Sequence, residues 1–129
     1  MVPSSTPVLI VDDDAAVRSA LKFALEAQGL EVRLYDSSAA LLAETNLPAR
    51  GCLVIDYRMP GMDGVLLVDS LRARGVDLPA ILISGRVTRG LRELAAKSGI
   101  DRVLEKPLSG SALIDGIRAV LKRPMSSAG

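Results

Sequence analysis

The sequence contains no histidine and a single cysteine, Cys52. Without histidine, the chain cannot carry Ser/His/Asp catalysis, a histidine-ligated zinc ion or a phosphohistidine of its own. One cysteine can form neither an internal disulfide nor a thiolate metal cage, and we interpret Cys52 as a small buried residue at the start of a strand. Chemistry in this chain must therefore use carboxylates, hydroxyls and lysine.

The sequence also lacks an excess of charge of one sign and lacks long apolar runs. It has 16 basic and 15 acidic residues, a net charge of +1, which argues against direct binding to nucleic acid. No apolar run reaches the roughly 18 residues that span a bilayer, and residues 1–7 do not resemble a signal peptide. We therefore expect a cytoplasmic protein that does not bind membranes.

The length and composition predict one compact domain. The chain has 129 residues, of which 49% are hydrophobic and 24% charged, and this size is sufficient to bury a core without disulfides or structural metals. We place the domain at residues 8–123. Residues 1–7 are expected to form a flexible N-terminal segment, and residues 124–129 a tail or the start of a linker.

Short apolar runs alternate with segments of helical periodicity along the whole chain. This alternation predicts an α/β fold in which a five-stranded parallel sheet is doubly wound with five helices, in the strand order 2-1-3-4-5. The expected strands are Val8–Val11, Glu31–Leu34, Cys52–Ile55, Ala80–Ile83 and Arg102–Leu104.

Serines and glycines mark the ends of the predicted helices. Ser38 and Ser109 stand where the N-caps of the second and fifth helices are expected. Gly29, Gly75 and Gly99 each follow a helical pattern, at the position where a left-handed residue commonly ends a helix. These signals agree with the helices that the apolar periodicity predicts.

Polar residues follow four of the five predicted strands. In an open parallel sheet, ligands bind outside the carboxyl ends of the strands, where the winding direction reverses. The second strand, expected at an edge of the sheet, contributes no such group, and this favours one localised site. The residues at the four strand ends are Asp12, Asp13, Asp14, Asp56, Ser84, Gly85 and Lys106.

Several ionised carboxylates cannot lie together without a counter-charge, because like charges at close range raise one another's pKa. A magnesium ion would resolve this repulsion, since it accepts a few carboxylate oxygens and leaves positions for phosphate oxygens. We therefore assign Asp12 and Asp13 to a metal site beside Asp56. Asp14 is instead interpreted as the N-cap of the first helix.

With a metal bound, Asp56 becomes a nucleophile towards phosphorus. Lys106 can neutralise charge on the transferring oxygens, and the Ser84 hydroxyl can donate a hydrogen bond to them. Taken singly, Lys106 could be an ordinary loop lysine and Ser84 an ordinary turn serine. The joint placement of these groups at one edge of the sheet is what favours phosphoryl transfer.

Four segments together resemble the response-regulator receiver domains of two-component signalling systems, and the resemblance extends from Val8 to about Leu121. It implies a chemotaxis-regulator-like, flavodoxin-like fold. The segments are VLIVDDD at 8–14, LVIDYRMPGMDG at 53–64, AILISGR at 80–86 and LEKP at 104–107.

The resemblance implies that Asp56 is the phosphoacceptor and that Ser84 and Lys106 contact the phosphoryl group. It also implies that Asp13, Asp56 and the backbone carbonyl of Arg58 bind magnesium directly, while Asp12 assists through water. The bond between Lys106 and Pro107 is often cis in such domains.

The phosphoryl donor implied by the resemblance is a sensor histidine kinase or a histidine phosphotransfer protein. The domain would then be a signalling receiver rather than an enzyme, apart from magnesium-dependent self-phosphorylation and autodephosphorylation. The loop RMPGMDG is similar to that of receivers joined to helix-turn-helix transcriptional regulators.

Val103 departs from the family pattern, because receivers usually carry Tyr or Phe three residues before the lysine. Since a valine cannot undergo the ring rotation that accompanies switching in such domains, we hypothesise that Ser84 and Val103 give a reduced conformational response. Arg58 and Arg86, each two residues after a site residue, admit two interpretations. They either flank the phosphate and prolong its lifetime or are solvated loop arginines.

The face formed by the fourth helix, the fifth strand and the fifth helix is the expected surface for a partner or for a homodimer. Its candidate residues, which could equally be a solvated charged face, are Arg89, Arg92, Arg102 and Arg118.

Three other functional classes fit the sequence less well. A haloacid-dehalogenase-like phosphatase needs a second aspartate two positions after the nucleophile, where this chain has Arg58. A flavodoxin-like cofactor binder needs a phosphate loop rich in glycine and hydroxyls after the first strand, where this chain has three aspartates. A receiver that acts only as a docking module would be expected to lack one of the acidic pair Asp12 and Asp13, the acceptor Asp56 or Lys106. This chain has all of them.

Overall fold

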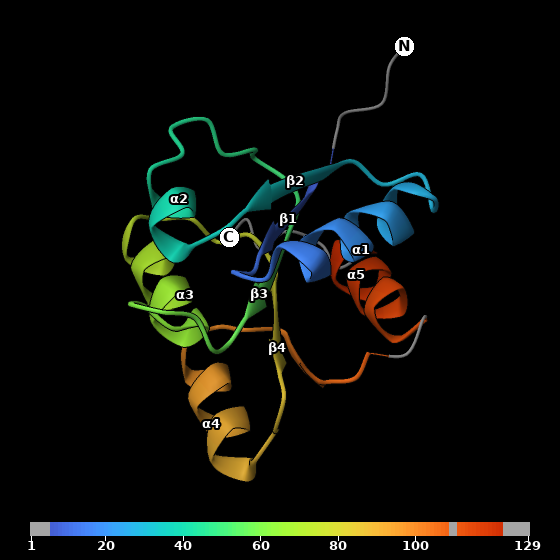
Figure 1. Ribbon diagram of the computed structural model, residues 1–129. Helices are drawn as coiled ribbons and strands as arrows, with labels where there is room; N and C mark the ends of the chain where they lie inside the picture. The colour runs from blue at the N-terminus through green and yellow to red at the C-terminus, as the bar shows by residue number, and fades with distance from the viewer. Residues whose placement is uncertain (1–5, 109–110, 123–129) are drawn as a thin grey trace.

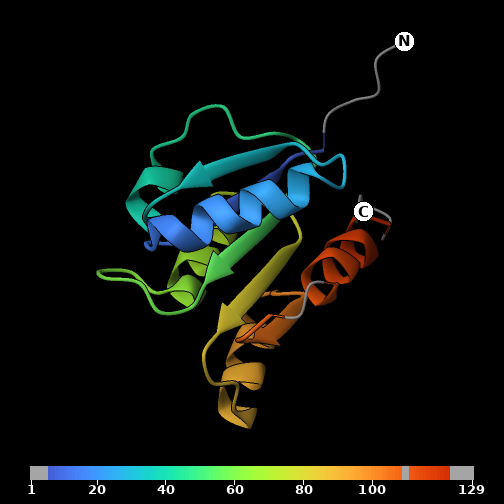
Figure 2. The same ribbon diagram turned by 45° about the vertical axis from the view of Figure 1, so that its right-hand side comes forward.

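The computed structural model describes residues 6–108 and 111–122. Five parallel strands form one sheet in the order β2-β1-β3-β4-β5, and helices cover both of its faces (Figure 1, Figure 2). The predicted fold class and strand order are confirmed. The elements are β1 Val8–Val11, α1 Ala15–Glu26, β2 Val32–Tyr35, α2 Ser38–Leu42, β3 Cys52–Asp56, α3 Gly64–Ala73, β4 Ala80–Ser84, α4 Arg89–Lys97, β5 Arg102–Glu105 and α5 Ala112–Lys122.

The sheet is buried on both faces, and this explains why its central strands are apolar up to the polar residues that end β3 and β4. Helices α1 and α5 lie on one face, and α2, α3 and α4 lie on the other (Figure 1). Side chains alternate between the two faces of a strand, so Leu9 and Val11 join the core beneath α2, α3 and α4 while Val8 and Ile10 join the core beneath α1 and α5.

No helix among the described residues is both long enough and apolar enough to cross a membrane.

Three strands extend one residue beyond their predicted ends. Asp56, Ser84 and Glu105 are the last residues of β3, β4 and β5, and the parallel register pairs Asp56 with Ile83 and Ser84 with Glu105. The predicted β2 is also shifted by one residue, since it spans Val32–Tyr35. Two of the predicted site residues are therefore fixed by the sheet itself rather than by the loops that follow.

The predicted N-cap of α2 is wrong by one residue. Ser37 is the N-cap, and its hydroxyl oxygen accepts a hydrogen bond of 3.0 Å from the Ala40 amide. The Ser38 hydroxyl instead donates to the Met62 carbonyl at 2.9 Å and is buried, so this serine connects α2 to the loop between β3 and α3. The predicted N-cap Ser109 lies outside the described residues.

The predictions for four small residues are confirmed. Gly29, Gly75 and Gly99 have positive φ angles of 84°, 84° and 79°. Cys52 is a buried free cysteine at the first position of β3, and burial raises the pKa of its thiol to about 12. The thiol therefore stays protonated at neutral pH and acts as a small core side chain.

Gly64 allows α3 to begin directly against the end of β3. Its amide donates a hydrogen bond of 2.8 Å to the Tyr57 carbonyl. A Cβ atom at this position would lie 2.7 Å from the Asp56 carbonyl oxygen, 2.8 Å from Leu82 Cδ1 and 2.9 Å from Ile55 Cγ2. Because two of these neighbours belong to β3 itself, a larger residue would displace the strand end that carries Asp56.

We predict that Gly64→Ala destabilises the fold by about 1–3 kcal/mol, the usual cost of overpacking a core. Gly116→Ala is the matched control, since Gly116 is also buried and helical. Its added Cβ would meet Arg102 and Ile81 at an ordinary 3.5 Å. This control should gain about 0.5–1 kcal/mol through lower backbone entropy. Urea unfolding measures both changes, and equal effects of the two variants would contradict the packing argument.

Candidate functional site

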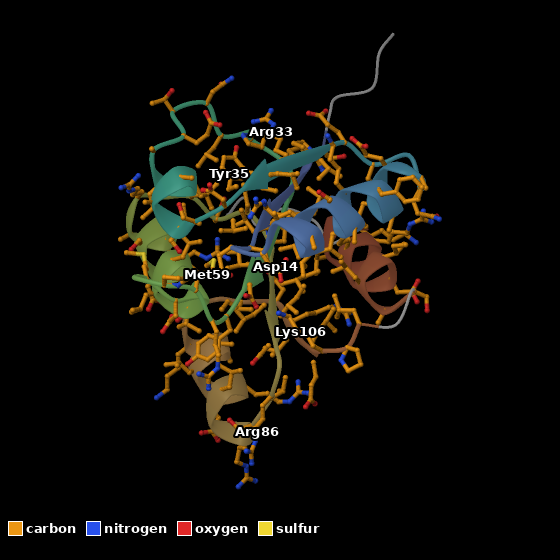
Figure 3. The ribbon with its side chains drawn as sticks, viewed as in Figure 1. Asp14, Arg33, Tyr35, Met59, Arg86 and Lys106 are labelled. Carbon is orange, nitrogen blue, oxygen red and sulfur yellow. The ribbon has the colours of Figure 1, made fainter. Side chains whose placement is uncertain are left out.

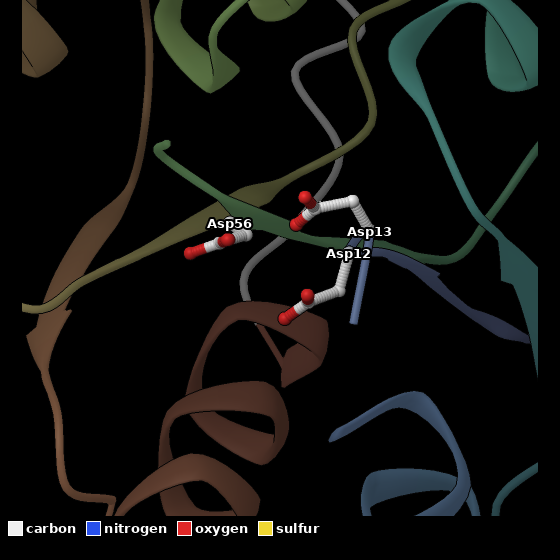
Figure 4. A group of neighbouring side chains, drawn as sticks. All are labelled: Asp12, Asp13 and Asp56. Carbon is white, nitrogen blue, oxygen red and sulfur yellow. The ribbon is translucent and has the colours of Figure 1, made fainter. Parts of the chain in front are cut away.

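Three aspartates meet at the carboxyl edge of the sheet, and we call Asp12, Asp13 and Asp56 the acidic cluster. One carboxylate oxygen from each residue lies within 4.8 Å of those of the other two (Figure 4). Asp12 and Asp13 directly follow β1, Asp56 ends β3, and these two strands are neighbours in the sheet. Asp12 and Asp56 are buried, whereas Asp13 is exposed.

The backbone and side chain of Asp12 are held by three hydrogen bonds. Its amide donates to the Tyr35 carbonyl at 3.2 Å, which connects the loop to β2. Its carboxylate accepts a bond of 2.9 Å from the Asp14 amide. Its carbonyl accepts a bond of 2.7 Å from Nη1 of Arg18. The start of the loop between β1 and α1 is thus fixed before any ligand binds.

Asp14 does not belong to the acidic cluster and is the N-cap of α1, as the sequence predicted. Its carboxylate accepts hydrogen bonds from the amides of Ala16 at 2.9 Å and Val17 at 3.2 Å. These bonds satisfy two amides that the first turn of a helix leaves without partners.

Lys106 supplies the positive charge at the acidic cluster. Its Nζ lies 3.1 Å from Oδ1 of Asp56, and its amide donates to the Ser84 carbonyl at 2.9 Å. The peptide bond between Lys106 and Pro107 is cis. Figure 3 shows the lysine beside the carboxyl ends of the central strands. Lys106 is therefore positioned to pair with an oxygen of Asp56 or with a group attached to it.

Burial disfavours the ionised form of two members of the acidic cluster. Removal from water raises the pKa of Asp12, and the charge of Asp56 raises it further. Removal from water also raises the pKa of Asp56, although Lys106 acts in the opposite direction through its hydrogen bond and charge. A cation among these oxygens would relieve both effects.

The donor set of the acidic cluster fits a hard divalent cation. All three ligands are carboxylate oxygens, which Mg²⁺ and Ca²⁺ prefer to nitrogen or sulfur. One side of the cluster is exposed through Asp13, so water or phosphate oxygens could complete the coordination. The structure thus brings together a set of residues able to hold a metal.

The Ser84 hydroxyl faces its own loop rather than the acidic cluster. The residue is buried, and its hydroxyl donates to the Arg86 carbonyl at 2.9 Å while accepting from the Arg86 amide at 3.3 Å. This hydroxyl would have to leave the carbonyl in order to donate to a group on Asp56.

Arg58 and Arg86 are exposed and line one open cavity of about 330 Å³, beside the N-terminal end of α4. Arg86 lies apart from Lys106, towards the lower end of α4 in Figure 3. Val103 is half-buried and lines a groove of about 300 Å³ with Ala95 and Ile100. Among the described residues, no hydrogen bond or ion pair joins any of these three side chains to the acidic cluster.

Sequence reasoning missed Arg18. Side chains of an α-helix tilt towards its N-terminus, and Arg18 stands four residues after the N-cap Asp14. Its guanidinium therefore points back to the loop that carries Asp12 and Asp13. An arginine at that spacing from an N-cap next to an acidic pair is the signal that could have found it.

The sequence profile of the response regulator receiver domain matches residues 8–118. The chain belongs to this family. Among curated relatives, the transcriptional regulatory protein FixJ of Azorhizobium caulinodans is 43% identical over 123 residues, which are 95% of this chain and 58% of FixJ. The response regulator protein TodT of Pseudomonas putida is 35% identical, over 95% of this chain and 54% of TodT. The receiver domain thus spans little more than half of these relatives.

Solved receiver structures agree with the family assignment. The crystal structure of FixJ-N has a TM-score of 0.86 at 32% identity and covers 96% of this chain and 99% of its own. A CheY-like receiver domain from Methanospirillum hungatei has a TM-score of 0.83 at 26% identity, covering 92% of this chain and 94% of its own. The strand order and helix arrangement described above are those of this family.

We predict that Asp12→Asn stabilises the receiver domain in metal-free buffer at about pH 7. The raised pKa of Asp12 means that its ionised form costs folding free energy. At a pH below the ordinary pKa of 3.8, the carboxyl is protonated in both the folded and the unfolded state, and the cost is absent. At a pH above the raised pKa of the folded state, the cost is complete. The gain should therefore vanish as the pH falls below 3.8.

Urea unfolding with a chelator present measures this gain at each pH. Asp69→Asn is the control, since Asp69 is an exposed aspartate on α3 outside the cluster, and it should change stability little. An Asp12→Asn protein less stable than wild type at neutral pH would contradict the prediction.

Proposed function

We propose that this receiver domain accepts a phosphoryl group on a carboxylate oxygen of Asp56, in a magnesium-dependent reaction. The donor is a phosphohistidine of a sensor histidine kinase or of a histidine phosphotransfer protein. The observation that carries the proposal is the position of Asp56. It is buried, it is paired with Lys106 at 3.1 Å, and it lies within 4.8 Å of two further carboxylates.

The transfer would run from the donor nitrogen to Asp56. An oxygen of Asp56 attacks the phosphorus atom, and the P–N bond breaks with its electron pair left on the imidazole nitrogen. The product is an acyl phosphate on Asp56. Water later attacks the phosphorus atom, which returns the carboxylate and releases inorganic phosphate.

Asp12, Asp13, Asp56 and the backbone carbonyl of Arg58 would hold the magnesium ion. When bound, this ion neutralises the carboxylates and the oxygens of the transferring group. Asp12 and Asp13 reach it from the loop after β1 and Asp56 from the end of β3. Because β1 and β3 are adjacent strands of one sheet, they would hold these carboxylates in place for the ion.

Lys106 and Ser84 would bind the oxygens of the transferred group. The ammonium of Lys106, now at Oδ1 of Asp56, can shift to a phosphoryl oxygen without leaving the site. The Ser84 hydroxyl would exchange the Arg86 carbonyl for a phosphoryl oxygen. Because Arg86 lies two residues before Thr88, the N-cap of α4, this exchange would release a restraint on the segment that leads into α4.

The relatives named transcriptional regulatory proteins support a place for this domain in a transcriptional regulator. That the regulator is of the helix-turn-helix kind is part of the proposal and rests on the resemblance of the loop at 58–64. We propose that the phosphorylated domain signals through the face formed by α4, β5 and α5. Arg89, Arg92 and Arg102 are exposed on α4 and β5. Arg118, the fourth candidate, is exposed on α5, and its Nη2 donates to Gln28 Oε1 at 3.3 Å, which directs it towards the end of α1 rather than towards this face.

Incubation with acetyl phosphate and magnesium should add one phosphoryl group to the wild-type protein, as measured by intact mass. Asp56→Asn should abolish the adduct, and a chelator should prevent it, because both the acceptor oxygen and the metal are needed. Asp69→Asn, which alters an exposed aspartate on α3, is the matched control and should keep the adduct. An adduct that survives in Asp56→Asn, or no adduct on wild type with any phosphoryl donor, would refute the proposal.

The decay of the same adduct tests Arg58 and Arg86. The double alanine variant should lose the phosphoryl group faster if the two guanidinium groups shield it from water. An unchanged lifetime would make them solvated loop arginines.

Val103 should limit the response of α4 to phosphorylation. Beryllofluoride mimics the phosphoryl group on an aspartate, and we expect only small amide chemical-shift changes in α4 when it binds the wild-type protein. Val103→Tyr, whose ring can enter the groove lined by Ala95 and Ile100, should enlarge these changes. A large rearrangement of α4 in the wild type would contradict the expectation. Changes confined to another face would contradict the signalling surface.

A further inference from the structure

The guanidinium of Arg18 forms a hydrogen bond with the backbone of the acidic cluster. Its Nη1 donates to the Asp12 carbonyl at 2.7 Å, and its side chain is half-buried. Its own amide donates to the Asp14 carbonyl at 3.0 Å. Arg18 therefore binds the loop between β1 and α1 at two carbonyls, that of Asp12 through its guanidinium and that of Asp14 through its amide.

The carbonyl that Arg18 binds belongs to the peptide between Asp12 and Asp13. Because a peptide unit is planar, fixing its carbonyl also fixes the plane of the Asp13 amide. The direction in which the Asp13 side chain leaves the backbone depends on that plane. A bond to Asp12 thus determines where the next carboxylate lies.

Asp13 is the member of the acidic cluster that most needs such support. The Asp12 carboxylate is bound by the Asp14 amide, and the Asp56 carboxylate is bound by Lys106. Within residues 6–108 and 111–122, no hydrogen-bond donor contacts the carboxylate of Asp13, which is also exposed. The backbone therefore provides the restraint on Asp13 that hydrogen bonds provide for the other two carboxylates.

We propose that Arg18 is a positioning residue that orients Asp13 through the peptide between Asp12 and Asp13, and so sets the affinity of the acidic cluster for Mg²⁺. The inference rests on the proposed function, because it assumes that Asp13 is a metal ligand. Among the described residues, Arg18 forms no hydrogen bond or ion pair with the carboxylates themselves. Its effect would pass through a backbone carbonyl. Groups that orient metal ligands in this way typically change metal affinity by about 10–100-fold when they are removed.

Arg74 provides a matched comparison. Its Nη1 donates to the Leu42 carbonyl at 2.8 Å, so it makes a bond of the same kind and of nearly the same length. That bond joins the end of α3 to the end of α2, outside the acidic cluster. Loss of either arginine removes one charge and one bond to a carbonyl, but only Arg18 acts on the acidic pair.

The test titrates Mg²⁺ into metal-stripped wild-type, Arg18→Met, Arg18→Lys and Arg74→Met proteins, with calorimetry as the readout. Methionine keeps an unbranched apolar stem but has no donor, whereas lysine keeps a charge and a donor. We expect Arg18→Met to bind Mg²⁺ about 10-fold more weakly or worse, Arg18→Lys to lie between it and wild type, and Arg74→Met to match wild type. Wild-type affinity in Arg18→Met, or an equal loss in Arg74→Met, would overturn the inference.

A kinetic measurement separates positioning from general destabilisation. The rate of phosphorylation by acetyl phosphate is followed as a function of Mg²⁺ concentration. In Arg18→Met the half-saturating concentration should rise about 10-fold, while the rate at saturating Mg²⁺ stays close to wild type. A lower saturating rate with an unchanged half-saturating concentration would overturn the inference. If Arg18→Met does not fold, Arg18→Lys takes its place in both measurements, and wild-type values for it count against the inference.

The wild-type protein distinguishes the two levels of the argument. If wild type takes no phosphoryl group on Asp56, the proposed function fails, whatever the Arg18 variants do. If wild type is phosphorylated and Arg18→Met shows wild-type dependence on Mg²⁺, the proposed function stands and only the role of Arg18 fails.

Discussion

Repulsion among three carboxylates is the constraint on which the site depends. Oxygens of Asp12, Asp13 and Asp56 lie within 4.8 Å of one another, and like charges at this range oppose their own ionisation, most strongly where water is excluded. One ammonium, that of Lys106, opposes this repulsion directly. The fold resists the remaining repulsion. β1 and β3 are adjacent strands buried on both faces, so they cannot move apart without opening the core.

The geometry of this parallel sheet explains why much of the candidate site could be predicted from the sequence. Carboxyl ends of parallel strands meet at one edge of a sheet, so four short apolar runs, each followed by a polar residue, suffice to place Asp12, Asp56, Ser84 and Lys106 near one another. The fold class could also be predicted, because the central strands are buried on both faces and are therefore apolar at successive positions. Neither inference needs the conformation of a loop.

What could not be predicted depends on single loop and side-chain conformations. Ser37 and Ser38 are both suitable N-caps by residue type, and only the entry angle of α2 decides which of them accepts the bond from Ala40. The hydrogen bond of Ser84 to the Arg86 carbonyl is likewise a choice between two partners for one hydroxyl. The alternative conformations differ in free energy by about one hydrogen bond, or about 1 kcal/mol. The pattern of residue types alone does not resolve so small a difference.

Arg18 and Lys106 show how two cations can serve one acidic site in different ways. The ammonium of Lys106 lies on a carboxylate and can neutralise charge that arrives there. The guanidinium of Arg18 lies on a backbone carbonyl instead, so it fixes geometry without occupying an oxygen that a metal or phosphate would need. A second cation placed on the carboxylates would compete with the metal. A cation bound to the peptide between Asp12 and Asp13 can instead hold these ligands in place and leave their carboxylate oxygens free.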